Sequence, residues 1–138
     1  MSNITVWFIK SAMVYFVLAM FVGISMTVAG PLYPYKPIHT HLNLLGWMSM
    51  MIYGVSYHIL PRFSGEPLWS DRLATIHLWT ANIGLIGMIA GWMAAEFGGG
   101  ITVLHIFSLI EGLSVMFFVT NMFMTVKAAP AMKKPMSK

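Results

Sequence analysis

The chain has 138 residues, of which 58% are hydrophobic and only 9% are charged, against about 25% charged in an average globular chain. It has no cysteine, which excludes disulfides, thiolate metal sites and cysteine nucleophiles. The net charge of +4 comes from basic residues near the ends of apolar segments, which indicates membrane orientation and not nucleic-acid binding. We therefore expect an all-α integral membrane protein.

Four apolar segments are long enough to cross a bilayer, because a spanning helix needs about 20 residues. They cover roughly residues 6–29, 39–60, 73–95 and 100–126, within one domain at 1–127 that precedes a basic tail at 128–138. Helix breakers separate the segments: Pro31, Pro34 and Pro37, then Pro61, Gly65 and Pro67, and finally Gly98, Gly99 and Gly100. Ser70 and Asp71 resemble N-caps of the third helix.

The basic residues predict the orientation of the four helices. An even number of spans puts both termini on one side of the membrane, and that side holds seven of the eight basic residues. Only Lys36 falls on the other side. We expect a multi-pass protein of the inner (cytoplasmic) membrane with both termini in the cytoplasm. The seven residues are Lys10, Arg62, Arg72, Lys127, Lys133, Lys134 and Lys138.

The predicted orientation gives each of the five histidines a depth. His39, His41 and His105 begin helices on the outer side, whereas His58 and His77 lie on the inner side, where each could be an interfacial hydrogen-bonding group. His41 and His58 are 17 residues apart, about 25 Å along a helix, so one metal ion cannot bind both.

His39 and His41 are separated by a single residue, Thr40. Residues two apart on an α-helix point about 200° apart, because one turn takes 3.6 residues. One ion bound by two ligands of a helix would favour i, i+4 spacing, so the pair favours a helix between two separate sites. Imidazole is a common axial ligand of heme iron, and a heme on each side would use both rings. From spacing alone, two histidines in the wet headgroup region are an equally good interpretation.

Glu111 falls near the middle of the fourth span, where an ionised carboxylate is costly. We expect its side chain to face the bundle interior. It could serve as a proton relay or as the partner of a histidine or a heme propionate. A helix-packing hydrogen bond to Ser108 or Ser114 is the alternative.

The second and third segments carry an ordered series of motifs. H-x-H-x-x-x-L-G-W is followed by Y-H-x-x-P-R, a short loop with glycine and L-W-S, and R-L-x-x-x-H-x-W. This series resembles the tenth and eleventh helices of the large subunit of heme-copper oxygen and nitric-oxide reductases, most of all the cbb-type oxidases. The matching residues are His39, His41, Leu45, Gly46, Trp47, Tyr57, His58, Pro61, Arg62, Gly65, Leu68, Trp69, Ser70, Arg72, Leu73, His77 and Trp79.

The resemblance implies heme ligation by both residues of the H-x-H pair. In the family its first histidine ligates the high-spin heme and its second the low-spin heme, which here would be His39 and His41. We expect heme b as the cofactor. The family's copper ligands and cross-linked tyrosine lie on helices without a counterpart here, so we expect an oxidoreductase relative that is not a complete oxygen reductase by itself.

The resemblance also implies an assembly. The family's twelve helices form three arcs of four, and this chain corresponds to one arc. We expect a homotrimer that rebuilds the ring, since identical subunits usually assemble with closed symmetry. A heme could then lie at each interface, between His41 of one subunit and His39 of the next.

The leading interpretation is a b-type membrane cytochrome that transfers electrons, with a respiratory redox partner, or binds a diatomic gas such as oxygen or nitric oxide. A heme-free accessory or assembly subunit of a respiratory complex is the first alternative. The second is a copper or zinc site at the outer surface, formed by His39, His41 and His105.

Overall fold

The computed structural model describes residues 1–29 and 35–127, and it is helical almost throughout this part of the chain. Pro31, Pro34 and the tail at 128–138 lie outside the described residues. The helical elements are α1 (Asn3–Ala29), α2 (Tyr35–His41), the π-helix η1 (Leu42–Ser49), α3 (Met50–Ser64), α4 (Asp71–Glu96) and α5 (Thr102–Thr125).

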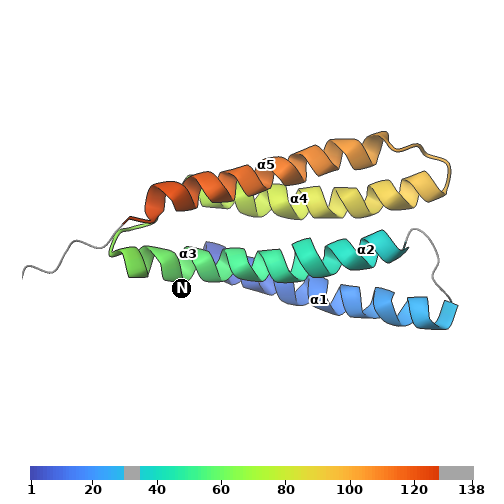
Figure 1. The fold of residues 1–138 in the computed structure, drawn as a ribbon, viewed down its shortest axis with the longest axis horizontal. Helices are drawn as coiled ribbons and strands as arrows, with labels where there is room; N and C mark the ends of the chain where they lie inside the picture. The colour runs from blue at the N-terminus through green and yellow to red at the C-terminus, as the bar shows by residue number, and fades with distance from the viewer. Residues whose placement is uncertain (30–34, 128–138) are drawn as a thin grey trace, which may run out of the picture.

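The helices run nearly parallel to one another in two layers (Figure 1). One layer pairs α4 with α5, and the other pairs α1 with the continuous run of α2, η1 and α3. The turn between α3 and α4 lies at one end of the bundle, and the α4–α5 connection lies at the other. Contacts of α1 with α4 and of α3 with α5 join the layers into a four-helix bundle.

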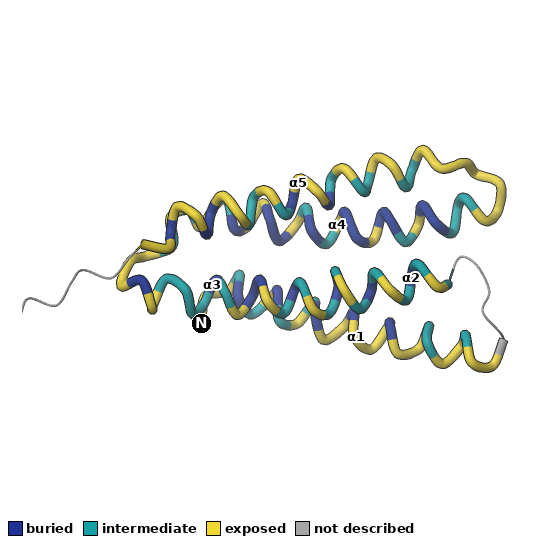
Figure 2. Tube along the Cα trace, in the orientation of Figure 1, coloured by how far each residue is buried: buried dark blue, intermediate teal, exposed yellow. Residues whose placement is uncertain are grey.

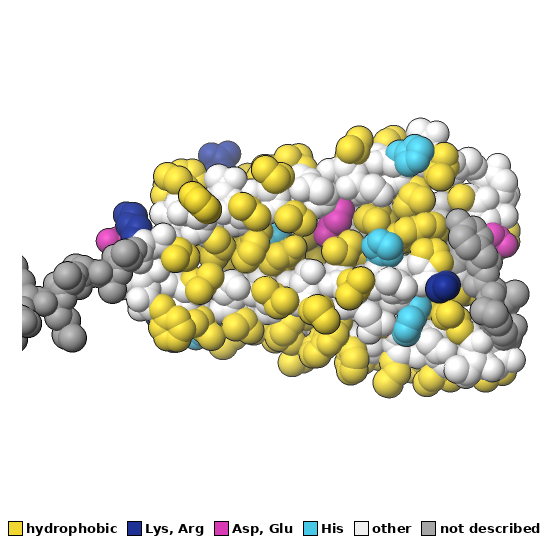
Figure 3. All heavy atoms as spheres, viewed as in Figure 1, with side chains coloured by type: hydrophobic (Ala, Val, Ile, Leu, Met, Phe, Trp, Pro, Cys, Tyr) yellow, Lys and Arg dark blue, Asp and Glu magenta, His cyan; other side chains and the backbone are white. Residues whose placement is uncertain are grey.

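Buried residues lie on the helix faces that meet, while the outer faces are exposed (Figure 2). The exposed side is strongly apolar; Phe21 is 61% exposed and Phe123 is 85% exposed. A soluble bundle would place polar side chains there, whereas a bilayer favours apolar ones. The space-filling view shows this apolar surface along most of the bundle (Figure 3). These features confirm the prediction of a helical membrane protein.

Three described helices, α1, α4 and α5, are individually long and apolar enough to cross a membrane. The predicted second span corresponds to residues 35–64, which η1 divides into shorter elements. Each of those elements is shorter than a full crossing, although together they form one uninterrupted helical run.

Two prolines lie within helices and not in the connections where we expected them. Pro37 is in the first turn of α2, where a backbone N–H has no intrahelical partner to lose. Pro61 is in the last turns of α3, which continues to Ser64. The helix instead ends at Gly65, whose φ of 65° is a left-handed C-cap conformation that glycine adopts easily.

Of the two residues predicted to cap the start of α4, one does so in the structure. The Ser70 hydroxyl accepts a hydrogen bond from the Leu73 N–H at 3.1 Å, so Ser70 is the N-cap. Asp71 is not a cap but the first residue of α4, where its charge complements the helix dipole.

Candidate functional site

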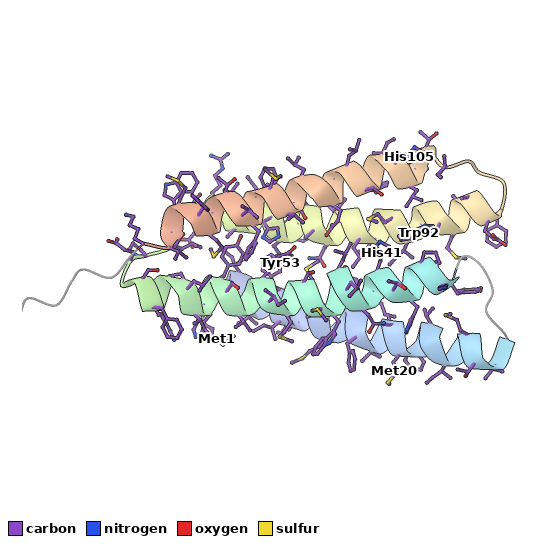
Figure 4. All side chains as sticks on the ribbon, viewed as in Figure 1. Met1, Met20, His41, Tyr53, Trp92 and His105 are labelled. Carbon is purple, nitrogen blue, oxygen red and sulfur yellow. The ribbon has the colours of Figure 1, made fainter. Side chains whose placement is uncertain are left out.

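His39 and His41 lie in the last turn of α2, and both side chains are half-buried. His39 contacts α1, whereas His41 points into the space between α2 and α4 (Figure 4). The two rings therefore leave the helix towards different neighbours, in keeping with their spacing. The structure places each histidine against a helix of its own chain and does not bring the two together.

The His39 ring is held against α1 by a backbone hydrogen bond. Its Nδ1 lies 2.9 Å from the Ala19 carbonyl oxygen, and since a carbonyl only accepts, Nδ1 carries the proton and Nε2 the lone pair. The ring fits because Gly23 has no side chain; a Cβ there would lie 2.8 Å from His39 Cε1. Asn43 shields the ring, with its amide nitrogen 2.9 Å from the His39 carbonyl and 3.4 Å from Nε2.

His41 has the same proton arrangement with different surroundings. Its Nδ1 donates to the Pro37 carbonyl oxygen at 2.9 Å, and its ring centroid lies 4.5 Å from that of Trp92. Within the residues that the structure describes, no side chain or backbone group hydrogen-bonds to Nε2. Metal-bound histidines usually donate their other ring N–H to a carbonyl or carboxylate. His41 thus already has the tautomer of a histidine ligand.

The π-helix η1 begins directly after His41. Such segments are rare and often lie at functional sites. The residues of η1 also bring α1 close, since a Cβ on Gly46 would lie 2.6 Å from Tyr15 Cβ. Neither η1 nor the contact of Asn43 with His39 was expected from the sequence. Asn43 could have been found, because it follows His39 by four residues and therefore shares its helix face.

His105 is exposed in the first turn of α5. In the described ranges, no three His, Asp or Glu side chains gather closely enough to hold a metal ion. The structure therefore does not bring His39, His41 and His105 together, and the outer-surface copper or zinc site has no geometric support.

Glu111 faces the bundle interior and is only 5% exposed, as predicted. The carboxylate occupies the space beside Gly84, where a Cβ would lie 2.5 Å from Oε2. Oε2 has no hydrogen-bond partner among the described residues. The hydroxyl of Ser114 donates to the backbone oxygen of Glu111 at 2.8 Å, so this expected packing bond does not involve the carboxylate.

The two inner histidines differ from each other. His77 is completely buried, so the expectation of an interfacial group is wrong for it; its ring lies among aromatic side chains of α1, α3 and α5. Its Nδ1 lies 2.9 Å from the Tyr57 hydroxyl. His58 is half-buried, and its Nε2 accepts from Arg62 Nη1 at 2.9 Å, which suits a residue near a helix end.

Comparisons with known proteins agree with the motifs. The sequence pattern of the family described as Cytochrome C and Quinol oxidase polypeptide I matches residues 34–102, half of the chain. The cbb3-type cytochrome c oxidase subunit CcoN1 of Stutzerimonas stutzeri is 32% identical over 87 residues, 54% of this chain and 18% of the relative. Cytochrome c oxidase subunit 1 of Rhodobacter capsulatus is 39% identical over 49 residues, 35% of this chain and 9% of the relative.

The matched region includes α2, η1, α3 and α4 and therefore both histidines of the pair. The chain spans less than a fifth of the length of these curated relatives. No solved structure gives a significant match. The resemblance drawn from the motifs is thus confirmed for part of the relatives' length.

Proposed function

The chain belongs to the cytochrome c and quinol oxidase polypeptide I family, and on this basis we propose that it is a membrane heme protein that binds heme b through His39 and His41. The observation that carries the proposal is the state of the two rings. In each, Nδ1 is used by a backbone carbonyl, which leaves Nε2 as the lone-pair nitrogen that a heme iron requires.

The two histidines fit heme to different degrees. The Nε2 of His41 is free of hydrogen bonds from the described residues, and Trp92 supplies an apolar surface beside the ring. For His39, the amide of Asn43 must turn away from Nε2 before the nitrogen can ligate. We therefore assign His41 as the ligand ready to bind and His39 as a second, shielded ligand. Bound heme would supply one-electron transfer or, with an open axial position, diatomic gas binding.

The proposed topology has four crossings, with residues 35–64 as the second. Both termini are then cytoplasmic, because Lys10, Arg62, Arg72 and Lys127 belong to one end of the bundle and Lys36 to the other. His39 and His41 lie towards the outer surface of the inner membrane in this orientation. The apolar outer faces of the helices support insertion in a bilayer.

We further propose that three copies assemble into a ring of twelve helices. The support is the family membership together with the resemblance of the described helices to one four-helix arc of the family's twelve-helix subunit. In the structure His39 and His41 pack on α1 and α4 of their own chain. A heme shared between subunits would therefore have to approach both histidine rings from outside the bundle.

The test of heme binding is an absorption spectrum of the detergent-purified protein, oxidised and dithionite-reduced, with pyridine hemochrome quantitation. We expect sharp reduced bands and a hemochrome of the b type. Added carbon monoxide then separates gas binding, which shifts the reduced bands, from electron transfer with both axial positions filled. A colourless protein after expression with ample heme would contradict the proposal and favour a heme-free accessory subunit.

A further inference from the structure

A groove lies between α1 and α4, which belong to different layers of the bundle. Its volume of about 490 Å³ is within the usual range of ligand pockets, roughly 300–1,000 Å³. From α1 it is lined by Ile4, Trp7 and Ser11, which are spaced three and four residues apart and so share one helix face, together with Asn3 at the start of the helix. We call this feature the α1–α4 groove.

The opposite wall of the groove comes from one face of α4. Thr75, Leu78, Trp79 and Asn82 line it, again at helical spacing. The lining of the two walls together is mainly apolar, with a few polar side chains from each helix. An apolar pocket with a small number of placed polar groups suits a ligand that is itself amphipathic.

The polar side chains of the α4 wall already donate hydrogen bonds within the protein. The Thr75 hydroxyl donates to the Asp71 carbonyl oxygen at 2.9 Å. The Asn82 amide donates to the Leu78 carbonyl oxygen at 2.7 Å, and its Oδ1 accepts from the Tyr15 hydroxyl at 2.8 Å. The donors of these two residues are therefore not free for a ligand.

Three other donors of the groove remain free. The Ser11 hydroxyl and the indole N–H groups of Trp7 and Trp79 have no hydrogen-bond partner among the residues that the structure describes. Trp7 is 58% exposed and Trp79 is 63% exposed, so both rings can be reached from outside the bundle. An indole N–H can only donate, which favours a ligand that brings oxygen acceptors.

A positive charge lies at the edge of the groove. The Lys10 ammonium is 5.3 Å from the centroid of the Trp7 ring, and in the described part of the chain it has no carboxylate or hydrogen-bond partner. At the start of α4 the opposite charges of Asp71 and Arg72 offset each other. Lys10 therefore supplies the excess charge, and the groove is complementary to an anion.

The groove belongs to the end of the bundle at which α4 begins and the α1 chain starts. In a bilayer this end lies near one membrane surface, where exposed tryptophans are typical. Basic groups between transmembrane helices at the cytoplasmic side bind anionic lipid head groups. A small water-soluble anion would leave the apolar walls uncovered, whereas a phospholipid brings phosphate and ester oxygens together with acyl chains.

We propose that the α1–α4 groove binds one anionic phospholipid. Lys10 pairs with the phosphate, the free donors of Ser11, Trp7 and Trp79 bind its oxygens, and the apolar walls contact the acyl chains. In the proposed topology this is a lipid of the cytoplasmic leaflet. The proposal goes beyond heme binding and needs only that the chain lies in a bilayer.

The experiment measures tryptophan fluorescence of the full chain in phosphatidylcholine vesicles that contain a minor fraction of brominated lipid. Bromine on the acyl chains quenches indoles that it contacts. The brominated lipid is either phosphatidylglycerol, which is anionic, or phosphatidylcholine, and each signal is divided by that in the same vesicles without bromine. We expect phosphatidylglycerol to quench more than its mole fraction predicts and phosphatidylcholine to follow its mole fraction.

Lys10→Gln should lower the preference for phosphatidylglycerol by about five-fold, the value of one basic residue near an anionic membrane surface. Lys10→Arg keeps the charge and should keep the preference. Lys127→Gln is the matched control, because Lys127 is an exposed lysine at the same end of the bundle but outside the groove, and it should quench as wild type does.

A second set of variants locates the lipid and does not depend on Lys10. Trp7→Phe and Trp79→Phe should each lose part of the excess quenching. Trp69→Phe should keep it, because Trp69 is 52% exposed at the same end of the bundle but does not line the groove.

Equal quenching by the two lipids in the wild-type protein would overturn the proposal, as it would if a second copy of the chain covers the groove. A loss in Lys127→Gln as large as that in Lys10→Gln would also overturn it, because the preference would then come from general surface charge. Excess quenching that persists in both Trp7→Phe and Trp79→Phe would place the lipid elsewhere and reject the groove.

Discussion

At the scale of single residues, the state of each candidate ligand depends on one hydrogen bond and one neighbour. The backbone carbonyls of Ala19 and Pro37 fix the tautomers of His39 and His41. The Ala19 carbonyl could not be identified from sequence, because it lies on a different helix, whereas Pro37 precedes His41 by four residues in the same helix. The two candidate ligands could be named from the sequence, whereas the positions of Gly23 and Asn43 beside the His39 ring became visible only in the structure.

Gly23→Ala tests whether heme binding depends on the position of the His39 ring against α1. The new Cβ would lie 2.8 Å from Cε1, so the ring must leave the Ala19 carbonyl. We expect the heme content per chain, or the reduced spectrum, to change while the protein still folds. Gly112→Ala is the control, because nothing lies within 4 Å of its added Cβ. An unchanged hemochrome and spectrum in Gly23→Ala would show that the position of the His39 ring is unimportant for binding.

At the scale of elements, the long helices follow from apolar length, whereas their interruptions do not. Apolar runs predicted α1, α4 and α5 closely, and Ser70 predicted a helix start. The π-helix η1 could not be predicted, because a continuously apolar segment is compatible both with an α-helix of 3.6 residues per turn and with a wider helix. Pro61 was taken for a helix end, but α3 continues for three more residues to Ser64, and Gly65 forms its C-cap.

The seam between α4 and α5 depends on glycines that face the partner helix. A Cβ on Gly91 would lie 2.6 Å from the backbone N and Cα of Leu104, which cannot move without separating the helices. We expect Gly91→Ala to lower the free energy of unfolding by about 1–3 kcal/mol, the usual cost of overpacking. Thermal denaturation in detergent measures the change against Gly112→Ala. Equal midpoints in both variants would contradict this description of the seam.

At the scale of the whole molecule, the apolar outer surface explains membrane insertion but not the number of subunits. Side chains that face a bilayer and side chains that face a neighbouring membrane subunit would both be apolar, so the exposed apolar residues of one chain do not separate the two. The polar interior is more informative: burial of Glu111 was predicted from its depth, whereas burial of His77 was not, because its position near a helix start suggested a wet interface. The His77 ring is buried because Phe8 and Phe118 from other helices pack against it.

The homotrimer has its own test. Native mass spectrometry from detergent, with cross-linking in membranes before extraction, should give three chain masses as the dominant species. The expectation follows from the resemblance of the described helices to one of the three four-helix arcs of the family fold. Monomers or dimers alone, in membranes as well as in detergent, would contradict it and leave heme binding within a single chain.

Heme ligation by His41 is tested most directly by the reduced-minus-oxidised spectrum of His41→Ala, measured beside that of His105→Ala. His105 is an exposed histidine on α5 and serves as the matched control. We predict that His41→Ala loses the reduced bands and most of its hemochrome, while His105→Ala retains both. A His41→Ala protein that folds and keeps the wild-type spectrum would contradict the claim.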